Sequence, residues 1–241
     1  MKIVDKILAK QADLRNAPAV TIAFLGYSVT QGCFDLYLKN DGSIETFFDQ
    51  NQVYHRDLGK ILSLLYPSVP INLINGGISG DNAPGGAGRL HQDVLSHNPD
   101  LVVVCFGLND VCGGLERLPV YEQALREIFK TLRERGIETI FMTPNTMCTE
   151  VSCHIREPAV REFAERIAQL QKDGTMDRYM DAARQICRES GVPVCDCYAR
   201  WQQLQENGVD TTDLLANHIN HPRKELHWLF AAELLNTMLQ R

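Results

Sequence analysis

The sequence predicts a three-layer α/β/α sandwich with a five-stranded parallel sheet in the middle. Five apolar runs are nearly continuous rather than alternating, which is typical of strands covered on both faces. Helix-compatible segments separate these runs, and strands that alternate with helices form parallel sheets with right-handed crossovers. The 241 residues, of which 44% are hydrophobic, suffice for one sizeable core and are too few for two comfortable domains. We therefore expect a single domain over residues 1–241.

The elements follow one another along the chain in a regular order. Residues 1–18 are predicted to be helical, because Ile3, Val4, Ile7 and Leu8 recur at helical spacing. The strands are predicted at 20–26, 70–76, 101–107, 137–143 and 192–197. The later helices are predicted at about 50–66, 86–97, 118–135, 158–190 and 222–240. A parallel sheet binds its ligands beyond the carboxyl ends of its strands, so the loops after the strands are the places to search for a site.

Charge and composition exclude several classes of protein. The net charge is -6 and the basic residues are dispersed, so the chain lacks the basic patch of a nucleic-acid-binding protein. No apolar run is long enough to span a bilayer, and the first residues lack the apolar centre of a signal peptide. We therefore expect a cytoplasmic protein without a membrane segment.

The eight cysteines are interpreted as mostly reduced and structural. Several lie in predicted buried strands, where cysteine behaves as a small hydrophobic residue. No C-x-x-C pair is present, which argues against the usual kind of zinc site. Cys148 and Cys153 are the pair to test first for a disulfide.

The loop after the first predicted strand reads GYSVTQG and contains Ser28. A serine at a tight strand-to-helix turn presents its hydroxyl to the ligand cleft, and the free N–H groups of the helix start can bind an oxyanion. Position 30 is threonine, so the loop is not the G-x-S-x-G turn of α/β-hydrolases. It is not a phosphate loop either, because no Gly-Lys-Ser or Gly-Lys-Thr follows.

The loops after the second and third strands carry candidate hydrogen-bond donors. The second reads NGGISGDN, and its glycines allow the backbone to point N–H groups at a ligand, although a flexible loop is the alternative. The third reads GLND, in which the amide of Asn109 can donate to a developing negative charge. For Asp110, capping of the next helix is the favoured role.

Near the C-terminus the sequence NHINHP places His221 directly before a proline. Proline favours the first position of a helix, so we expect His221 at a helix start with a fixed orientation. This histidine follows the last predicted strand and therefore lies on the same sheet edge as Ser28.

These four blocks, in this order, resemble the SGNH, or GDSL-like, hydrolase family over residues 20 to about 230. The resemblance implies a flavodoxin-like fold and a serine esterase that works through an acyl-enzyme, without metal or cofactor. It implies Ser28 as nucleophile and His221 as general base. The oxyanion hole would then consist of the N–H groups of Ser28 and Gly80 and the side chain of Asn109.

Two positions depart from the family pattern. Tyr27 stands where the family usually has Asp in its first block, and His218 stands where the family has an Asp three residues before the catalytic histidine. An Asp there would orient the imidazole and stabilise its protonated form. Three replacements remain open: a Ser28–His221 dyad steered by a backbone carbonyl, His218 itself, or a carboxylate such as Asp213 or Glu225. We favour the first two.

The expected substrate is a small ester with a short acyl group, carried by a carbohydrate. Two insertions, 33–50 and 145–180, are too polar for a lipid tunnel. The candidate wall residues in them are Phe34, Tyr37, Phe47, Phe48, Met147 and His154.

Three other functions compete with the esterase. Tyr27 and His218 suggest a non-catalytic or weakly active member of the same fold that binds a carbohydrate or another ligand. A metal site of His218, His221 and His227 would lack nearby carboxylates. The fold alone also allows a nucleotide binder, which the missing phosphate loop disfavours.

Overall fold

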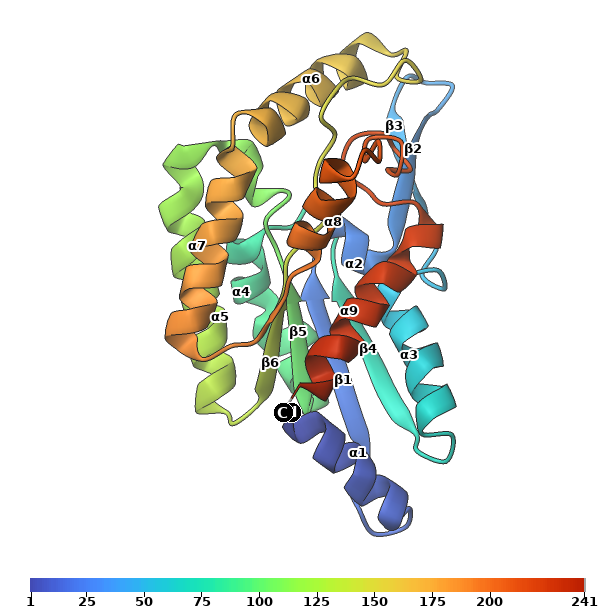
Figure 1. Ribbon diagram of the computed structural model, residues 1–241, viewed down its shortest axis with the longest axis vertical. Helices are drawn as coiled ribbons and strands as arrows, with labels where there is room; N and C mark the ends of the chain where they lie inside the picture. Colours follow the sequence, from blue (N-terminus) through green and yellow to red (C-terminus); the bar gives the residue numbers. More distant parts are fainter. Residues whose placement is uncertain (241) are drawn as a thin grey trace.

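A computed structural model describes residues 1–240; Arg241, the last residue of the predicted domain, lies outside the described residues. Its main sheet has five parallel strands, as predicted, and their order is β4-β1-β5-β6-β7 (Figure 1). The strands are β1 (Val20–Gly26), β4 (Ile71–Gly77), β5 (Leu101–Cys105), β6 (Glu138–Met142) and β7 (Val194–Cys195). β1 is therefore flanked by β4 and β5, and the loops after these three strands lie side by side.

Helices cover both faces of this sheet, so the predicted three-layer sandwich is confirmed (Figure 1). One layer contains α1 (Lys2–Ala12), α3 (Tyr54–Leu65), α8 (Cys197–Glu206) and α9 (His227–Leu239). The other contains α4 (Ala83–Asp93), α5 (Leu118–Glu134) and α7 (Thr175–Ser190). Every residue of β1 and β5 is buried, which explains their continuous apolar sequence. No helix within residues 1–240 is long and apolar enough to cross a membrane.

Several predicted boundaries differ from the structure. The segment predicted as one helix, 158–190, is two helices, α6 (Pro158–Lys172) and α7, because Gly174 between them has a left-handed backbone with φ of 79°. The last strand ends at Cys195 rather than at residue 197. The side chain of Asp196 accepts a hydrogen bond from the N–H of Ala199 and so starts α8, a helix that the sequence analysis did not predict.

Residues 33–50 contain a hairpin that the sequence analysis treated only as an insertion. Strands β2 (Cys33–Leu38) and β3 (Ile44–Phe48) pair in antiparallel fashion and form a separate small sheet. The hairpin follows α2 (Ser28–Gln31) and rises beyond the carboxyl end of the main sheet, on the side opposite α1 (Figure 1). It is therefore placed to form a wall beside the loops that follow the strands.

All eight cysteines are free thiols, in agreement with the prediction that most are reduced. Cys148 is buried and Cys153 is exposed, and the two are not joined.

Candidate active site

The turn that carries Ser28 is tight because β1 passes directly into α2. A Cβ atom at Gly26 would lie 2.2 Å from Oγ1 of Thr30, so only glycine fits at this point of the turn. Ser28 is the first residue of α2 and is 4% exposed. Its N–H, in the first turn of the helix, has no partner within that helix.

Ser28 and His221 are 193 positions apart in the sequence, but their side chains are in contact. The Ser28 Oγ atom lies 2.8 Å from Nε2 of His221, and the other ring nitrogen, Nδ1, lies 3.2 Å from the carbonyl oxygen of Phe34. The Cys33 Sγ atom is 3.4 Å from the same nitrogen. A carbonyl oxygen can only accept, so we assign the proton to Nδ1, which leaves Nε2 free to accept the hydroxyl proton of Ser28. The pair has the hydrogen-bond arrangement of a nucleophile and its general base.

The backbone that holds His221 is a loop rather than the predicted helix start. The Asn217 side-chain oxygen accepts hydrogen bonds from the N–H groups of Ile219, Asn220 and His221. Pro222 forms an antiparallel bridge with Leu215 instead of opening a helix, and α9 begins only at His227. The backbone position of His221 is therefore held by this asparagine and by the bridge.

Burial keeps the imidazole of His221 neutral. The side chain is 7% exposed, and desolvation lowers its pKa from 6.5 to about 4, although the hydrogen bond to Phe34 acts in the opposite direction. The base is therefore unprotonated at neutral pH. The carbonyl beside Nδ1 offers the imidazolium a dipole rather than the full charge of a carboxylate.

His218 does not contact the Ser28–His221 pair. Its backbone is left-handed with φ of 54°, and its ring stacks on His154 at 5.0 Å between ring centroids. Its Nδ1 lies 4.0 Å from a carboxylate oxygen of Asp213. Asp213 and Glu225 are both exposed, and no hydrogen bond among residues 1–240 joins His218, Asp213 or Glu225 to the His221 ring. Of the three replacements considered for the missing Asp, only the backbone carbonyl lies at Nδ1.

The candidate oxyanion donors lie on either side of Ser28. Gly80 follows β4 with φ of 78°, and Asn109 follows β5 and donates through Nδ2 to the carbonyl of Asp81 at 2.7 Å. Within residues 1–240 the Gly80 N–H donates to no protein acceptor, and the second Nδ2 hydrogen of Asn109 is also unused. The strand order thus brings all three predicted donors to one edge of the sheet.

Asp110 does not cap the helix that follows it, which was its favoured role, but contacts the start of α4. Its carboxylate accepts a hydrogen bond at 2.9 Å from the N–H of Ala83, the first residue of α4, next to the N-cap residue Asn82. Burial raises its pKa from 3.8 to about 6.

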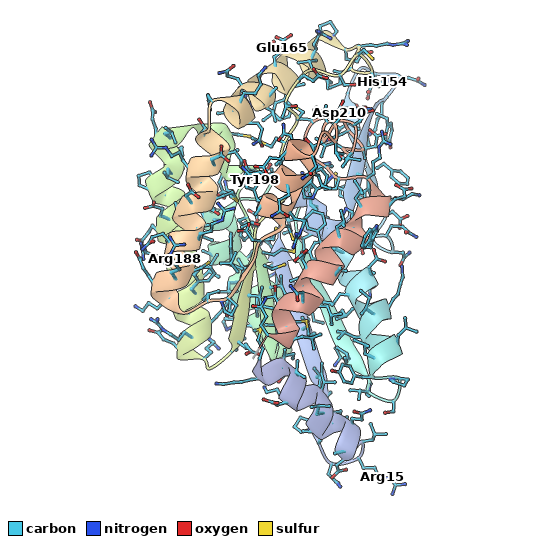
Figure 2. The ribbon with its side chains drawn as sticks, viewed as in Figure 1. Arg15, His154, Glu165, Arg188, Tyr198 and Asp210 are labelled. Carbon is cyan, nitrogen blue, oxygen red and sulfur yellow. The ribbon has the colours of Figure 1, made fainter. Side chains whose placement is uncertain are left out.

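A cleft of about 220 Å³ lies next to the segments that hold His221. Its lining residues are Asp35, Leu36, Tyr37, His154, Ile155, Arg156, Glu157, Val160, Asn217 and His218. Figure 2 shows His154 at the end of the molecule opposite Arg15, above the carboxyl end of the sheet. Of the predicted wall residues, Tyr37 and His154 line the cleft, Phe34 and Met147 are buried in the core, and Phe47 and Phe48 are exposed on the hairpin.

The other readings of these residues find little support. Tyr27 is 1% exposed and packs against Phe106, so it presents no surface to a ligand. Among residues 1–240 no three His, Cys, Asp or Glu side chains are arranged to hold a metal ion. His227 accepts a hydrogen bond from the N–H of Tyr54 through Nδ1 and stacks on its ring.

A buried serine that is hydrogen-bonded to a neutral histidine, at the carboxyl edge of a parallel sheet, is compatible with a hydrolase of the nucleophilic-serine class. The GDSL-like Lipase/Acylhydrolase family model matches residues 24–229. An acetylxylan esterase from Geobacillus stearothermophilus is 28% identical over 193 residues, which cover 76% of this chain and 78% of that enzyme. An arylesterase from Vibrio mimicus is 34% identical over 82 residues, 33% of this chain and 40% of that enzyme.

The same fold occurs in a solved structure. The crystal structure of an acetylxylan esterase from Geobacillus stearothermophilus has a TM-score of 0.66 and 23% identity, over 92% of this chain and 95% of that one. The chain belongs to the GDSL-like Lipase/Acylhydrolase family. It is a carboxylic ester hydrolase.

Proposed function

We propose that the protein removes short acyl groups from esters of carbohydrates, with Ser28 as nucleophile and His221 as general base. The observation that carries the assignment of these two residues is the 2.8 Å contact between Ser28 Oγ and His221 Nε2. The neutral state of the buried imidazole supports it, because a general base must be unprotonated to accept the serine proton.

The reaction then proceeds in two displacements. His221 Nε2 takes the hydroxyl proton of Ser28 while Oγ attacks the ester carbonyl, and the new oxyanion binds the N–H groups of Ser28 and Gly80 and the amide of Asn109. The carbon–oxygen bond to the alcohol breaks, and the alcohol leaves with the proton from Nε2. Water then attacks the acyl carbonyl while His221 Nε2 takes one of its protons. The carbon–oxygen bond to Ser28 breaks, Oγ recovers the proton from Nε2, and the carboxylic acid leaves.

We further propose that the base is oriented by the Phe34 carbonyl, as a dyad without a carboxylate. The 3.2 Å distance to Nδ1 and the exposed positions of Asp213 and Glu225 support this arrangement. A carbonyl holds the same tautomer that an Asp would hold, but it stabilises the imidazolium of the transition state less.

Two observations support a short acyl group on a carbohydrate. The curated relative that matches most of this chain is an acetylxylan esterase. The cleft beside the site combines the half-exposed ring of Tyr37 with charged side chains of both signs, Arg156 and Glu157, and with the imidazole of His154. An aromatic face bordered by hydrogen-bonding groups suits a sugar better than a lipid chain. We propose that Tyr37 and His154 contact the sugar.

Ser28→Ala should abolish the hydrolysis of p-nitrophenyl acetate and of acetylated xylo-oligosaccharides. Ser63→Ala is the matched control, because Ser63 is an exposed serine in α3 that only bonds back to the carbonyl of Gly59. Labelling with a fluorophosphonate, followed by peptide mapping, should identify Ser28 alone. Unchanged turnover in Ser28→Ala, or labelling of another residue, would refute the assignment.

We also propose a cytoplasmic location and a single domain that does not bind nucleic acid. Eight free cysteines suit a reducing compartment, one continuous core joins the described elements, and the net charge of -6 repels phosphate. Detection of the protein in a membrane-free cytosolic fraction tests the location. Recovery in a secreted fraction would contradict it.

A further inference from the structure

Arg89 in α4 connects the backbone segments that carry the candidate catalytic groups. We propose that Arg89 is a positioning residue, which holds the nucleophile turn and the oxyanion loop in register through its guanidinium group. The inference rests on the proposed function, since it concerns the geometry of the same site. Neither the motifs of the sequence nor the Ser28–His221 pair points to this arginine.

The guanidinium makes four short contacts from a position that is 14% exposed. Nη2 donates to the carbonyl of Gly26 at 2.7 Å, and Nη1 donates to the carbonyl of Gly76 at 2.6 Å. Nε donates to Asp81 Oδ2 at 2.6 Å, and Nη1 also contacts Asp93 at 3.1 Å. Two of these partners are carbonyls at the ends of adjacent strands, β1 and β4.

These partners lie next to the groups that would bind the oxyanion. Gly26 precedes Ser28 by two residues, and its carbonyl also accepts from the N–H of Ile78 at 3.2 Å. Asp81 directly follows Gly80, and its own carbonyl accepts from Asn109 Nδ2 at 2.7 Å. A chain of hydrogen bonds therefore runs from Arg89 to all three loops. A shift of Arg89 would move the N–H groups of Ser28 and Gly80, which lie next to its partners. It would move the amide of Asn109 through the carbonyl of Asp81.

An arginine suits this place because its planar fork directs several N–H groups at fixed angles. A lysine presents a point charge on a flexible stem and cannot bind both carbonyls and the carboxylate together. Gly85 in α4 leaves space for the Arg89–Asp81 ion pair, because a Cβ atom at this position would lie 1.8 Å from Oδ1 of Asp81. The positive charge is offset by Asp81 and Asp93, so the role of Arg89 is to fix geometry rather than to stabilise the oxyanion directly.

Arg89→Met tests the inference through kcat, KM and the rate of fluorophosphonate labelling of Ser28. A misplacement of about 1 Å in an active site can cost about 100-fold in rate, so we expect kcat and the labelling rate to fall about 10- to 100-fold. We expect KM to change less than about twofold, because Arg89 does not border the sugar cleft.

Arg184→Met is the matched control for a purely structural loss. Arg184 in α7 is also mostly buried, with 21% of its side chain exposed, and it bonds to Asp196 at 2.9 Å and to Asp181 at 2.8 Å. None of its hydrogen bonds reaches the three site loops. Its loss should lower the melting temperature as Arg89→Met does, but kcat below the transition should remain that of the parent.

Two further variants keep the test decisive if Arg89→Met does not fold. Asp81→Asn removes the ion pair but keeps the carbonyl that Asn109 binds, and Arg89→Lys keeps the charge without the fork; both should lower kcat. Millimolar guanidinium chloride should partly restore the kcat of Arg89→Ala and leave Arg184→Ala unchanged.

A parental kcat in Arg89→Met or Asp81→Asn, or an equal loss of kcat in Arg184→Met, would overturn the inference. These results are distinct from a failure of the proposed function. If the probe does not label Ser28 in the parent protein, the proposed function fails. If it labels Ser28 at the parental rate in Arg89→Met, only the role of Arg89 fails.

Discussion

Acidification should leave this enzyme active well below the pH at which most histidine-dependent hydrolases lose their base. His221 is buried beside a carbonyl, and desolvation lowers its pKa from 6.5 to about 4. At pH 5.5 such an imidazole is ~97% neutral, whereas one with a pKa of 6.5 is ~9% neutral. The two cases differ ~10-fold in the fraction of competent base at that pH.

The measurement is kcat/KM for acetate release between pH 4 and pH 8, because this ratio reports the groups of the free enzyme. Acetate is quantified by chromatography, so that the signal does not depend on the ionisation of a leaving group. We expect a plateau through neutral pH and a decline with an inflection near pH 4. An inflection at pH 6.5 or above would refute the reasoning, since it would mean that the ring is solvated or faces an anion.

Three further results are expected from the same structure. Burial lowers the pKa of His55 from 6.5 to about 4 and that of His227 from 6.5 to about 3, so below pH 6.5 these histidines bind more protons in the unfolded chain than in the folded one. Stability should therefore fall as the pH drops from 6.5 towards these folded values, by about 1.4 kcal/mol for each histidine at pH 5.5, as thermal unfolding would detect. The Cys33 sulfur lies 3.4 Å from Nδ1 of His221, so Cys33→Asp would place a carboxylate near this nitrogen. A negative charge there favours the protonated ring and should move the kcat/KM inflection upward by about 1–3 pH units. Tyr37→Ala should raise KM for acetylated xylo-oligosaccharides about fivefold, from the loss of about 1 kcal/mol of ring contact, and leave p-nitrophenyl acetate unaffected.

Each of these results has a control variant or an outcome that would contradict it. A melting temperature that does not fall between pH 7 and pH 5.5 would contradict the burial of neutral histidines. Cys33→Ser supplies no charge and should keep the inflection of the parent, so an equal shift in both variants would exclude the carboxylate as its cause. Phe47 is equally exposed on the same hairpin but does not line the cleft, and Phe47→Ala should leave both KM values unchanged.

The sheet could be predicted from sequence because burial on both faces leaves a simple pattern. The runs of β1 and β5 are continuous and apolar, and the structure places them in the middle of the sheet. The hairpin was predictable as well, because Asp41-Gly42 between two strand-like segments is a strong turn sequence. Strand β7 was predicted too long because a helix cap at Asp196 overrides the apolar pattern.

The positions of several candidate site residues could be predicted from the strand pattern. Ser28, Gly80 and Asn109 each follow a strand, and parallel strands bring such loops together. The partner of His221 Nδ1 could not be predicted, because every residue has a backbone carbonyl and the sequence does not show which one lies at the ring. The helix start expected at Pro222 was wrong, because tertiary pairing with Leu215 outweighed the local preference of proline.

The Phe34 carbonyl has a consequence for how the enzyme can change. An orienting carboxylate can be deleted by a single substitution, whereas every residue type at position 34 retains a carbonyl. Scanning mutagenesis of side chains would therefore not detect this carbonyl, the group that we propose to orient His221. A shift of β2 would withdraw it, so the position of the hairpin that borders the cleft affects the tautomer of His221.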